Sequence, residues 1–143
     1  MIGCFLIAVL LILTASSSAV RVSSNGGGGG LLSYQHVSVS SELTGGKVLL
    51  VHCKSADDDL GIHNLTAGSE FKWQFVPLIQ GGTTLFWCYL APDDSHHASF
   101  EAYNNDHRIY EYKTHTYWIG KDDGVYAKLV DKNVDMLVYH WLD

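Results

Sequence analysis

The chain has 143 residues, of which 47% are hydrophobic, and it contains 4 Trp, 8 Tyr and 5 Phe. This aromatic content excludes a disordered polypeptide and predicts a single packed domain. The formal net charge is -6, from 9 Lys+Arg against 15 Asp+Glu, and the cations are scattered along the sequence, which excludes a nucleic-acid-binding surface.

The chain begins with an apolar segment from Ile2 to Leu13, followed by small residues with Ser17 and Ala19 in the -3 and -1 positions that signal peptidase accepts. Residues 1–19 therefore resemble a secretory signal peptide, and the apolar segment is shorter than the roughly 20 residues of a membrane-spanning helix. The alternative is a membrane anchor, because no Lys or Arg precedes the apolar segment. Cleavage after Ala19 predicts a secreted, extracellular protein that does not insert into the membrane.

Residues 20–33 are rich in Gly and Ser and include the glycine run Gly26–Gly30. A segment without apolar periodicity cannot offset the entropy lost on ordering, so a flexible tail is expected here. The folded domain is therefore expected to span residues 34–143.

Alternation of apolar and polar residues dominates this domain. In Phe71–Phe75 the aromatic residues occupy the odd-numbered positions, which places them on one face of a predicted strand. The continuous apolar runs Val48–Val51 and Leu85–Trp87 predict central strands that are covered on both faces. Gly-, Asn- and Asp-rich turns separate the runs, and Leu137–Trp141 can supply the last strand. About eight short strands result, which predicts an all-β fold, an antiparallel β-sandwich, with a small barrel as the alternative.

Of the three cysteines, Cys4 leaves with the predicted signal peptide, and Cys53 and Cys88 enter an oxidising compartment. We expect a disulfide between these two, and the alternative is a pair of free buried thiols. The secretory route also makes Asn64-Leu65-Thr66 usable for N-glycosylation, with Asn64 as the predicted acceptor, although this pattern also occurs by chance.

Two longer strings are specific: residues 53–61 read CKSADDDLG, and residues 84–88 read TLFWC. Together with the strand at Phe71–Phe75 and the later Phe100 and Trp118, they resemble the plant self-incompatibility protein family, the homologues of the secreted stigma proteins of poppy. The resemblance covers about residues 35–142. It implies a secreted β-sandwich and, for the founding members, a ligand role in the rejection of self pollen.

The sequence departs from the family pattern in its cysteines. Members commonly carry further cysteines around the position of Trp118, where this chain has Lys113, Thr116 and Tyr126. A second disulfide is therefore not expected, and the pairing of Cys53 with Cys88 stays open at this point.

The polar clusters give no positive sign of catalysis. Asp57–Asp59 lacks the alternating spacing of a calcium loop, so we expect a charged turn with local hydrogen bonds. His52 and His63 would need distant ligands to bind zinc. On a strand, His52 points away from Cys53, and the motifs of common hydrolases are absent. No catalytic residue, metal site or cofactor is predicted, and a small secreted hydrolase is kept as the second alternative function.

The predicted function is that of an extracellular signalling or recognition ligand that contacts a cell-surface receptor or another extracellular protein through its loops. The candidate partner-contact residues are Asp93, Asp94, His96, His97, Asp106 and His107. The first alternative is a lectin-like carbohydrate-binding module with a sugar-binding face lined by Trp73, Trp87, Trp118 and Trp141, although at least Trp73 and Trp87 are expected in the core.

The histidine content predicts a response to mild acid. Protonation of all 8 His would change the net charge from -6 to -6 + 8 = +2. Because an unperturbed histidine has a pKa of about 6.5, most of this change falls in the mildly acidic range. The loop histidines His96, His97 and His107 should respond first, and an acidic partner surface is then expected to be attracted at the lower pH. The alternative is that these histidines are solvated and that their titration only shifts solubility.

Overall fold

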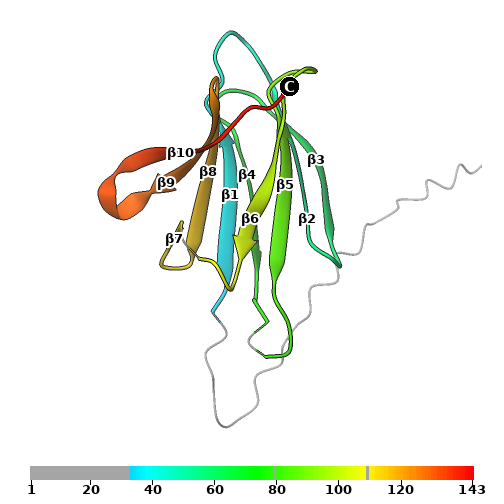
Figure 1. Cartoon of the computed structure of the whole chain (residues 1–143), viewed down its shortest axis with the longest axis vertical. Coiled ribbons are helices and arrows are strands. Elements are labelled where there is room, and N and C mark those ends of the chain that lie inside the picture. Colours follow the sequence, from blue (N-terminus) through cyan, green and yellow to red (C-terminus); the bar gives the residue numbers. More distant parts are fainter. Residues whose placement is uncertain (1–32, 79, 109) are drawn as a thin grey trace, which may run out of the picture. The chain divides into compact units, whose positions relative to one another are not determined.

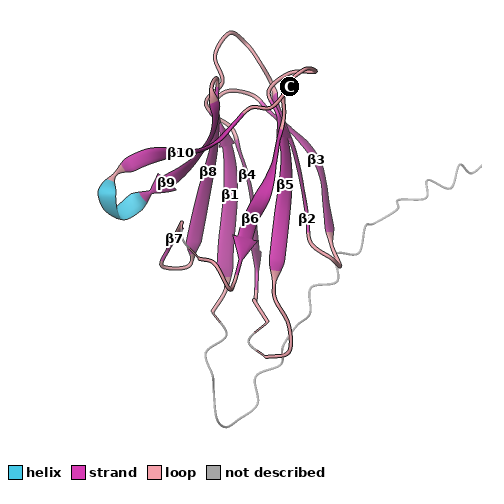
Figure 2. Cartoon of the chain, in the orientation of Figure 1, coloured by secondary structure: helices cyan, strands magenta, loops and turns pink. Residues whose placement is uncertain are grey.

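The computed structural model describes residues 33–143 except Ile79 and Ile109, so the predicted signal peptide and nearly all of the predicted tail lie outside the described residues. This part of the chain is built from β-strands with one short 3₁₀ turn (Figures 1 and 2). The elements are β1 (Gln35–Ser41), β2 (Leu49–Lys54), β3 (Asp59–Leu65), β4 (Glu70–Phe75), β5 (Leu85–Ala91), β6 (Ala98–Asn104), β7 (Glu111–Tyr112), β8 (His115–Lys121), β9 (Gly124–Leu129), η1 (Val130–Lys132) and β10 (Val134–His140).

The strands form two sheets. The first has the order β10-β9-β8-β1-β4, with β7 paired to β8, and the second has the order β3-β2-β5-β6. Every pair is antiparallel except β1 and β8, which run parallel. The predicted all-β sandwich is confirmed. The strand number was underestimated, since a two-residue strand such as β7 is too short to show a periodicity.

The core lies between the two sheets and is made by the inward-facing residue of each pleat. In β2 the buried residues are Leu49, Val51 and Cys53, and the residues between them are half-buried or exposed. The aromatic residues of Phe71–Phe75 also share the inner face, as predicted, and they join a series of ring contacts through the core. These contacts are His63–Phe71, Phe71–Trp73, Trp73–Phe86, Phe75–Phe86 and Phe75–Tyr103.

The two continuous apolar runs are not covered on both faces. They do form the central strands β2 and β5 of the second sheet, but Leu50 and Trp87 are only half-buried, because successive strand residues point to opposite faces. The expectation that Trp87 belongs to the core is therefore wrong. Trp73 does pack against the core.

The predicted disulfide is confirmed. Cys53 and Cys88 lie opposite each other in the β2/β5 register, both are fully buried, and their sulfur atoms are bonded. The bond joins the two central strands of the second sheet.

Candidate functional site

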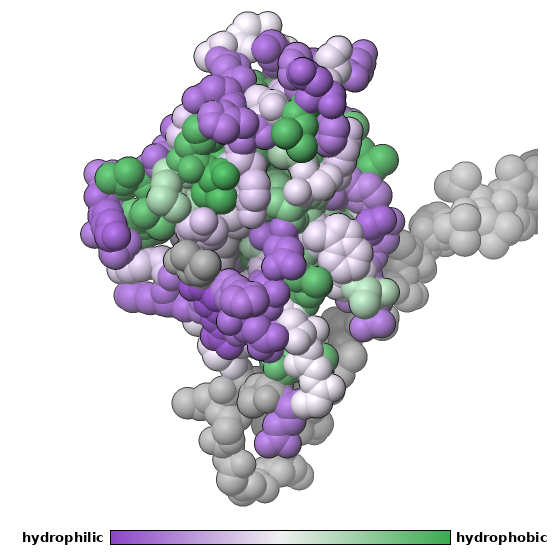
Figure 3. Space-filling view, viewed as in Figure 1, coloured by the Kyte–Doolittle hydropathy of each residue, from purple (hydrophilic) through white to green (hydrophobic). Residues whose placement is uncertain are grey.

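Loops from five parts of the chain gather at one end of the sandwich. They are residues 42–48, 66–69, 92–97, 122–123 and the C-terminal residues 141–143, and we call them the loop end. The Glu42 amide donates to the Gly120 carbonyl at 2.8 Å, and the C-terminus lies beside the β5/β6 connection (Figure 1). Hydrophilic residues cover most of this end in the view of Figure 3, where it is uppermost.

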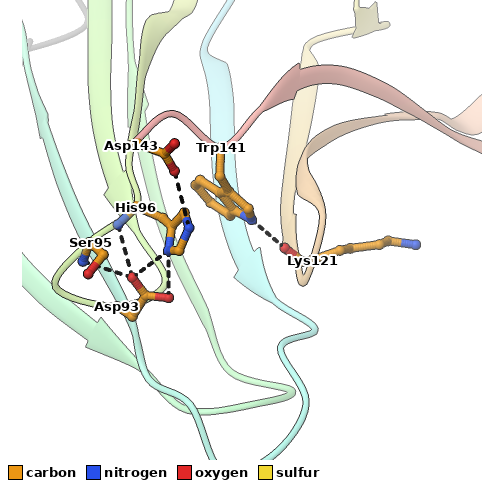
Figure 4. Close-up of polar contacts among 6 residues, drawn as sticks. All are labelled: Asp93, Ser95, His96, Lys121, Trp141 and Asp143. Atoms are coloured by element: carbon orange, nitrogen blue, oxygen red, sulfur yellow. Dashed lines mark hydrogen bonds and ion pairs between the residues drawn. The ribbon is translucent and has the colours of Figure 1, made fainter.

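Asp93 fixes the conformation of the β5/β6 loop. Its Oδ1 accepts hydrogen bonds from the backbone amides of Ser95 and His96, each at 2.9 Å, and from His96 Nδ1 at 2.8 Å (Figure 4). An aspartate that caps the amides following it is a common way to stabilise a turn. The loop therefore holds its shape without contacts from a partner.

The C-terminus anchors the same loop. His97 and Leu142 exchange two backbone hydrogen bonds at 2.9 and 2.8 Å, and His96 Nε2 lies 3.4 Å from a carboxylate oxygen of Asp143. Trp141 Nε1 donates to the Lys121 carbonyl at 2.9 Å, which joins the C-terminus to the β8/β9 turn (Figure 4). The sequence predicted Trp141 as part of a last strand, and this anchoring role was missed.

Two further contacts join the β1/β2 loop to the β8/β9 hairpin. Asp122 accepts from the Thr44 amide at 3.0 Å and from the Thr44 hydroxyl at 2.5 Å, and the hydroxyl contact is the main reason that the Asp122 pKa is lowered. Lys121 Nζ lies 2.7 Å from Asp135 Oδ2 and 3.3 Å from Glu42 Oε2. The hydrogen bond to Asp135 is the main cause of the raised pKa of Lys121.

The loop end carries an excess of negative charge. Its carboxylates come from Glu42, Asp93, Asp94, Asp122, Asp123 and Asp143. The cations at this end are Lys47 and the neighbouring Lys121. Asp94 is exposed, and the Asp143 side chain is fully exposed, so both can meet a partner directly.

The six candidate contact residues do not form one surface. Asp93, Asp94, His96 and His97 lie at the loop end. Strand β6 then runs the length of the sandwich, about 20 Å at roughly 3.3 Å per residue, before Asp106 and His107.

At that opposite end, Asp106 accepts from the Thr83 hydroxyl at 2.8 Å, and the His107 amide donates to the Asn104 carbonyl at 3.0 Å. Asp106 and His107 therefore stabilise loops at this opposite end of the sandwich. His96 lies in the β5/β6 loop at the other end.

The acidic triplet forms a charged turn, as predicted. Asp59 Oδ1 accepts from the Gly61 amide at 2.9 Å and from His52 Nε2 at 2.7 Å, and the Gly61 contact is the larger cause of the lowered Asp59 pKa. His63 faces the other side of the sheet, where its ring stacks on Phe71 at 3.7 Å. Among the described residues, no group of three or more His, Cys, Asp or Glu side chains could hold a metal ion.

The tryptophans do not share a face. Trp118 is 2% exposed and donates to the Ala102 carbonyl at 2.9 Å within the core, whereas Trp87 lies on the outer face of the second sheet. Trp73 packs inward, and Trp141 holds the C-terminus. A sugar-binding platform needs several rings on one surface, and these four rings do not provide it.

We expect Asp93 to titrate below the ordinary aspartate pKa of about 3.9. The hydrogen bond from the His96 ring is the largest cause of this lowered pKa, followed by the Ser95 amide. In an NMR titration, His96→Gln should raise the Asp93 pKa part of the way back. His97→Gln is the matched control and should leave it unchanged, because the His97 ring stacks on Tyr89 instead.

The lowered pKa of Asp93 also determines how this carboxyl changes the stability of the fold with pH. A carboxyl whose folded pKa is depressed stabilises the fold above its unfolded pKa, and this contribution is lost as the pH falls through the folded pKa. An Asp93 pKa that does not respond to His96→Gln would contradict the assigned hydrogen bond.

Asn64 remains the predicted glycosylation site, and its place in the fold suits that role. It is exposed on edge strand β3, opposite Leu50. We expect the secreted protein to shift to lower apparent mass on treatment with peptide N-glycosidase. Asn64→Gln and Thr66→Ala should both abolish the shift, because each removes one required residue of the acceptor pattern. A shift that survives both substitutions would place the glycan elsewhere.

Within the described part of the chain, no helix has the length and apolar character needed to cross a membrane.

Comparison with known families gives a match to the plant self-incompatibility protein S1 family over residues 36–141. The chain is 35% identical over 114 residues to S-protein homolog 74 of Arabidopsis thaliana, which covers 77% of this chain and 73% of that protein. It is 33% identical over 113 residues to S-protein homolog 1 of the same plant, with coverage of 77% and 73%.

A solved structure has a similar fold. It represents the self-incompatibility protein homologues, described as "a widespread family of small, highly stable, secreted proteins from plants". The TM-score is 0.57 at 17% sequence identity, and the match covers 77% of this chain and 96% of the other. At this identity the likeness supports the β-sandwich fold.

Proposed function

The chain belongs to the plant self-incompatibility protein S1 family, and we propose that it acts as an extracellular recognition ligand whose loop end contacts a receptor or another extracellular protein. It is a secreted protein, as members of this family are. Recognition between pollen and stigma, the process implied for the founding members, is one setting in which such a ligand would act.

The observation that carries the proposal is the fixed shape of the loop end. Asp93 holds its own loop, His97 pairs with Leu142, and Trp141 joins the C-terminus to the β8/β9 turn. Loops that are ordered before binding lose little conformational entropy in a complex, so more of the contact energy appears as affinity. The exposed Asp94 and Asp143 are the side chains offered to the partner.

The charge of the loop end favours a partner with a basic surface. The excess of carboxylates creates a negative potential, which would speed association with a positive patch and make binding sensitive to salt. His96 is already bonded to Asp93 and lies near Asp143, so it is not free to attract an acidic partner. We therefore propose a partner with a basic surface at the loop end, in place of the acidic partner expected from histidine content alone.

A non-enzymatic role is part of the proposal. The polar residues that the sequence singled out make hydrogen bonds within the fold, such as His52 to Asp59 and Thr83 to Asp106. The tryptophans are spread over both the core and the surface, so no specific observation favours the carbohydrate-binding alternative.

Binding to plasma-membrane vesicles from plant tissue tests the proposal. The double variant Asp94→Asn with Asp143→Asn should bind at least about fivefold more weakly than the parent, mainly through slower association, because charges at the rim of an interface act on the association rate. Asp131→Asn is the matched control, since Asp131 is exposed in η1 away from the loop end, and it should bind like the parent. Equal loss in both variants, or no loss in either, would overturn the proposed contact surface.

A further inference from the structure

A groove lies on the outer face of the first sheet, across the neighbouring strands β8, β1 and β4 (Figure 1). Its volume is about 540 Å³. The side chains that line it alternate along each strand with residues that point into the core, such as Val37 and Trp73. They are polar, and they include His36, Ser38, Lys72, Gln74, His115 and Tyr117. The proposed recognition role uses none of these residues.

The hollow follows from one short side chain between two long ones. Ser38 on β1 lies directly opposite Lys72 on β4 and Tyr117 on β8. Ser38 is only 7% exposed, so its hydroxyl lies at the floor of the groove, whereas the Lys72 side chain is 78% exposed and reaches outward. Neighbouring strands are about 4.8 Å apart, so one small ligand can contact all three strands at once.

The next row across the same strands brings two histidines into contact. His36 lies opposite His115 on β8 and opposite Gln74 on β4. The two imidazole rings stack with their centroids 4.5 Å apart and their planes at 9°, and the Tyr117 ring lies 5.8 Å beyond His115. Two protonated rings at this distance repel each other, so an anion bound against both would favour the doubly protonated pair.

The charges that face this pair make the groove responsive to pH. On β4, Lys72 Nζ lies 3.6 Å from Glu70 Oε1, and these two charges offset each other. On β7, Tyr112 lies opposite His115, and Lys113 Nζ is 5.5 Å from the centroid of the Tyr112 ring. Protonation of both histidines therefore gives the lining a charge of +2, in a chain whose formal net charge is -6. Burial, followed by the charge of the neighbouring histidine, lowers the pKa of His115.

The donors favour an anion that carries several oxygen atoms on one centre. Ammonium, amide, hydroxyl and imidazole groups come from three adjacent strands. A carboxylate offers two oxygens in one plane, whereas the phosphate group of an ester offers three strong acceptor oxygens and about -1.5 to -2 charges. A metal ion is not favoured, because no group of three or more His, Cys, Asp or Glu side chains in the described ranges could hold one.

We propose that this groove binds the phosphate group of a small phosphate ester, with His36, His115 and Lys72 as its cationic contacts. The Ser38 and Tyr117 hydroxyls supply further donors beside them. The organic part of the ester would occupy the remaining volume of the groove. Because the bound anion favours protonated histidines, binding should strengthen as the pH falls from about 8 to about 6.

NMR titration of the secreted protein with inorganic phosphate, glycerol phosphate and sulfate tests this site. All three should shift the ring resonances of His36 and His115 and should saturate below about 10 mM. Sulfate keeps its charge over this pH range, so its binding, about fivefold tighter at pH 6 than at pH 8, reports the histidines alone. Malonate, a dicarboxylate, should bind at least about fivefold more weakly than sulfate at pH 6.

Substitution of the two histidines tests the origin of the pH dependence. The double variant His36→Gln with His115→Gln should bind sulfate equally at both pH values, and as weakly as the parent does at pH 8. His140→Gln is the matched control, because His140 is exposed at the end of β10 and does not line the groove. In the parent, bound sulfate should raise the pKa of His115.

Substitution of the charged pair on β4 tests the contact with the anion. Lys72→Gln should weaken sulfate binding about threefold at both pH values, and Glu70→Gln should strengthen it, because each changes the charge beside the anion. Lys54→Gln is the matched control, since Lys54 is exposed on β2 of the second sheet, and it should bind like the parent. Lys72 and Glu70 are exposed, so these variants should fold even if the histidine variant does not.

Thermal unfolding of each variant would verify that the fold is kept. The proposal is overturned if neither phosphate nor sulfate saturates the protein, or if malonate binds as tightly as sulfate. It is equally overturned if a folded double histidine variant keeps the pH dependence of the parent, or if Lys72→Gln binds like the parent. These outcomes are independent of the vesicle experiment, because Asp94 and Asp143 do not line this groove.

Discussion

Replacing Cys53 and Cys88 together with alanine should lower the free energy of unfolding by about 4 kcal/mol. The disulfide closes a loop with a sequence separation of 35, and the chain-entropy model relates the stabilisation to the length of that loop. Most small domains are stable by only about 5 to 15 kcal/mol, so this loss is large. Because both cysteines are fully buried, the substitution also removes packing from the core.

Urea unfolding of the secreted protein measures this effect. With a slope of about 1.5 kcal/mol per M, the midpoint should fall by roughly 2 to 3 M. Reductant should lower the midpoint of the parent by a similar amount and should not affect the double variant. A double variant within about 1 kcal/mol of the parent would show that the bond does not constrain the unfolded chain.

Trp118→Ala should destabilise the fold by about 4 kcal/mol, and Trp87→Ala by only about 1 kcal/mol. Both substitutions replace tryptophan with alanine, but Trp118 faces the core from the first sheet and Trp87 lies on the outer face of the second. Trp118 is 2% exposed, contacts the Phe100 ring at 4.7 Å and donates to the Ala102 carbonyl. Trp87 is half-buried on the outer face.

Thermal or urea unfolding of both variants, each compared with the parent, gives the difference directly. A large cavity and an unsatisfied carbonyl follow from the loss of Trp118, whereas solvent can fill the space left by Trp87. Equal losses of stability would mean that the inner position of Trp118 in the first sheet or the outer position of Trp87 in the second is wrongly assigned.

Local patterns predicted the parts of the fold that depend on neighbouring residues. The alternation in Phe71–Phe75 placed its rings on one face, and the short reach of aspartate side chains made a turn at Asp59 the expected outcome. The pairing of Cys53 with Cys88 followed from there being no other cysteine in the predicted mature chain. These predictions needed no knowledge of how distant strands are arranged.

Features that depend on topology could not be predicted in the same way. The apolar run around Trp87 looks the same in sequence whether one face or two are covered. In the described part of the chain, no further sheet covers the outer face of this strand. His96 and His107 lie in similar sequence surroundings, yet β6 carries them to opposite ends. The anchoring of His97 by Leu142 uses backbone atoms, which leave no pattern in the side chains.

A cavity beside Glu111 is a further example. Its lining comes from strands far apart in the chain, including β6, β8 and β10, and the parallel pairing of β1 with β8 helps to place them. No local motif joins Tyr103, Glu111 and Tyr139, so the sequence held no signal for a cavity there.

Site-directed photocrosslinking tests the proposed ligand role most directly. A benzophenone amino acid would replace Ser95 in the loop end, where the side chain is exposed, and Lys132 in η1 as the matched control. The secreted protein would be irradiated on plant plasma-membrane vesicles. The predicted result is a covalent adduct with an extracellular protein from position 95, lost when unlabelled parent competes, and no such adduct from position 132. An adduct from position 132 alone, or none from either position, would contradict recognition through the loop end.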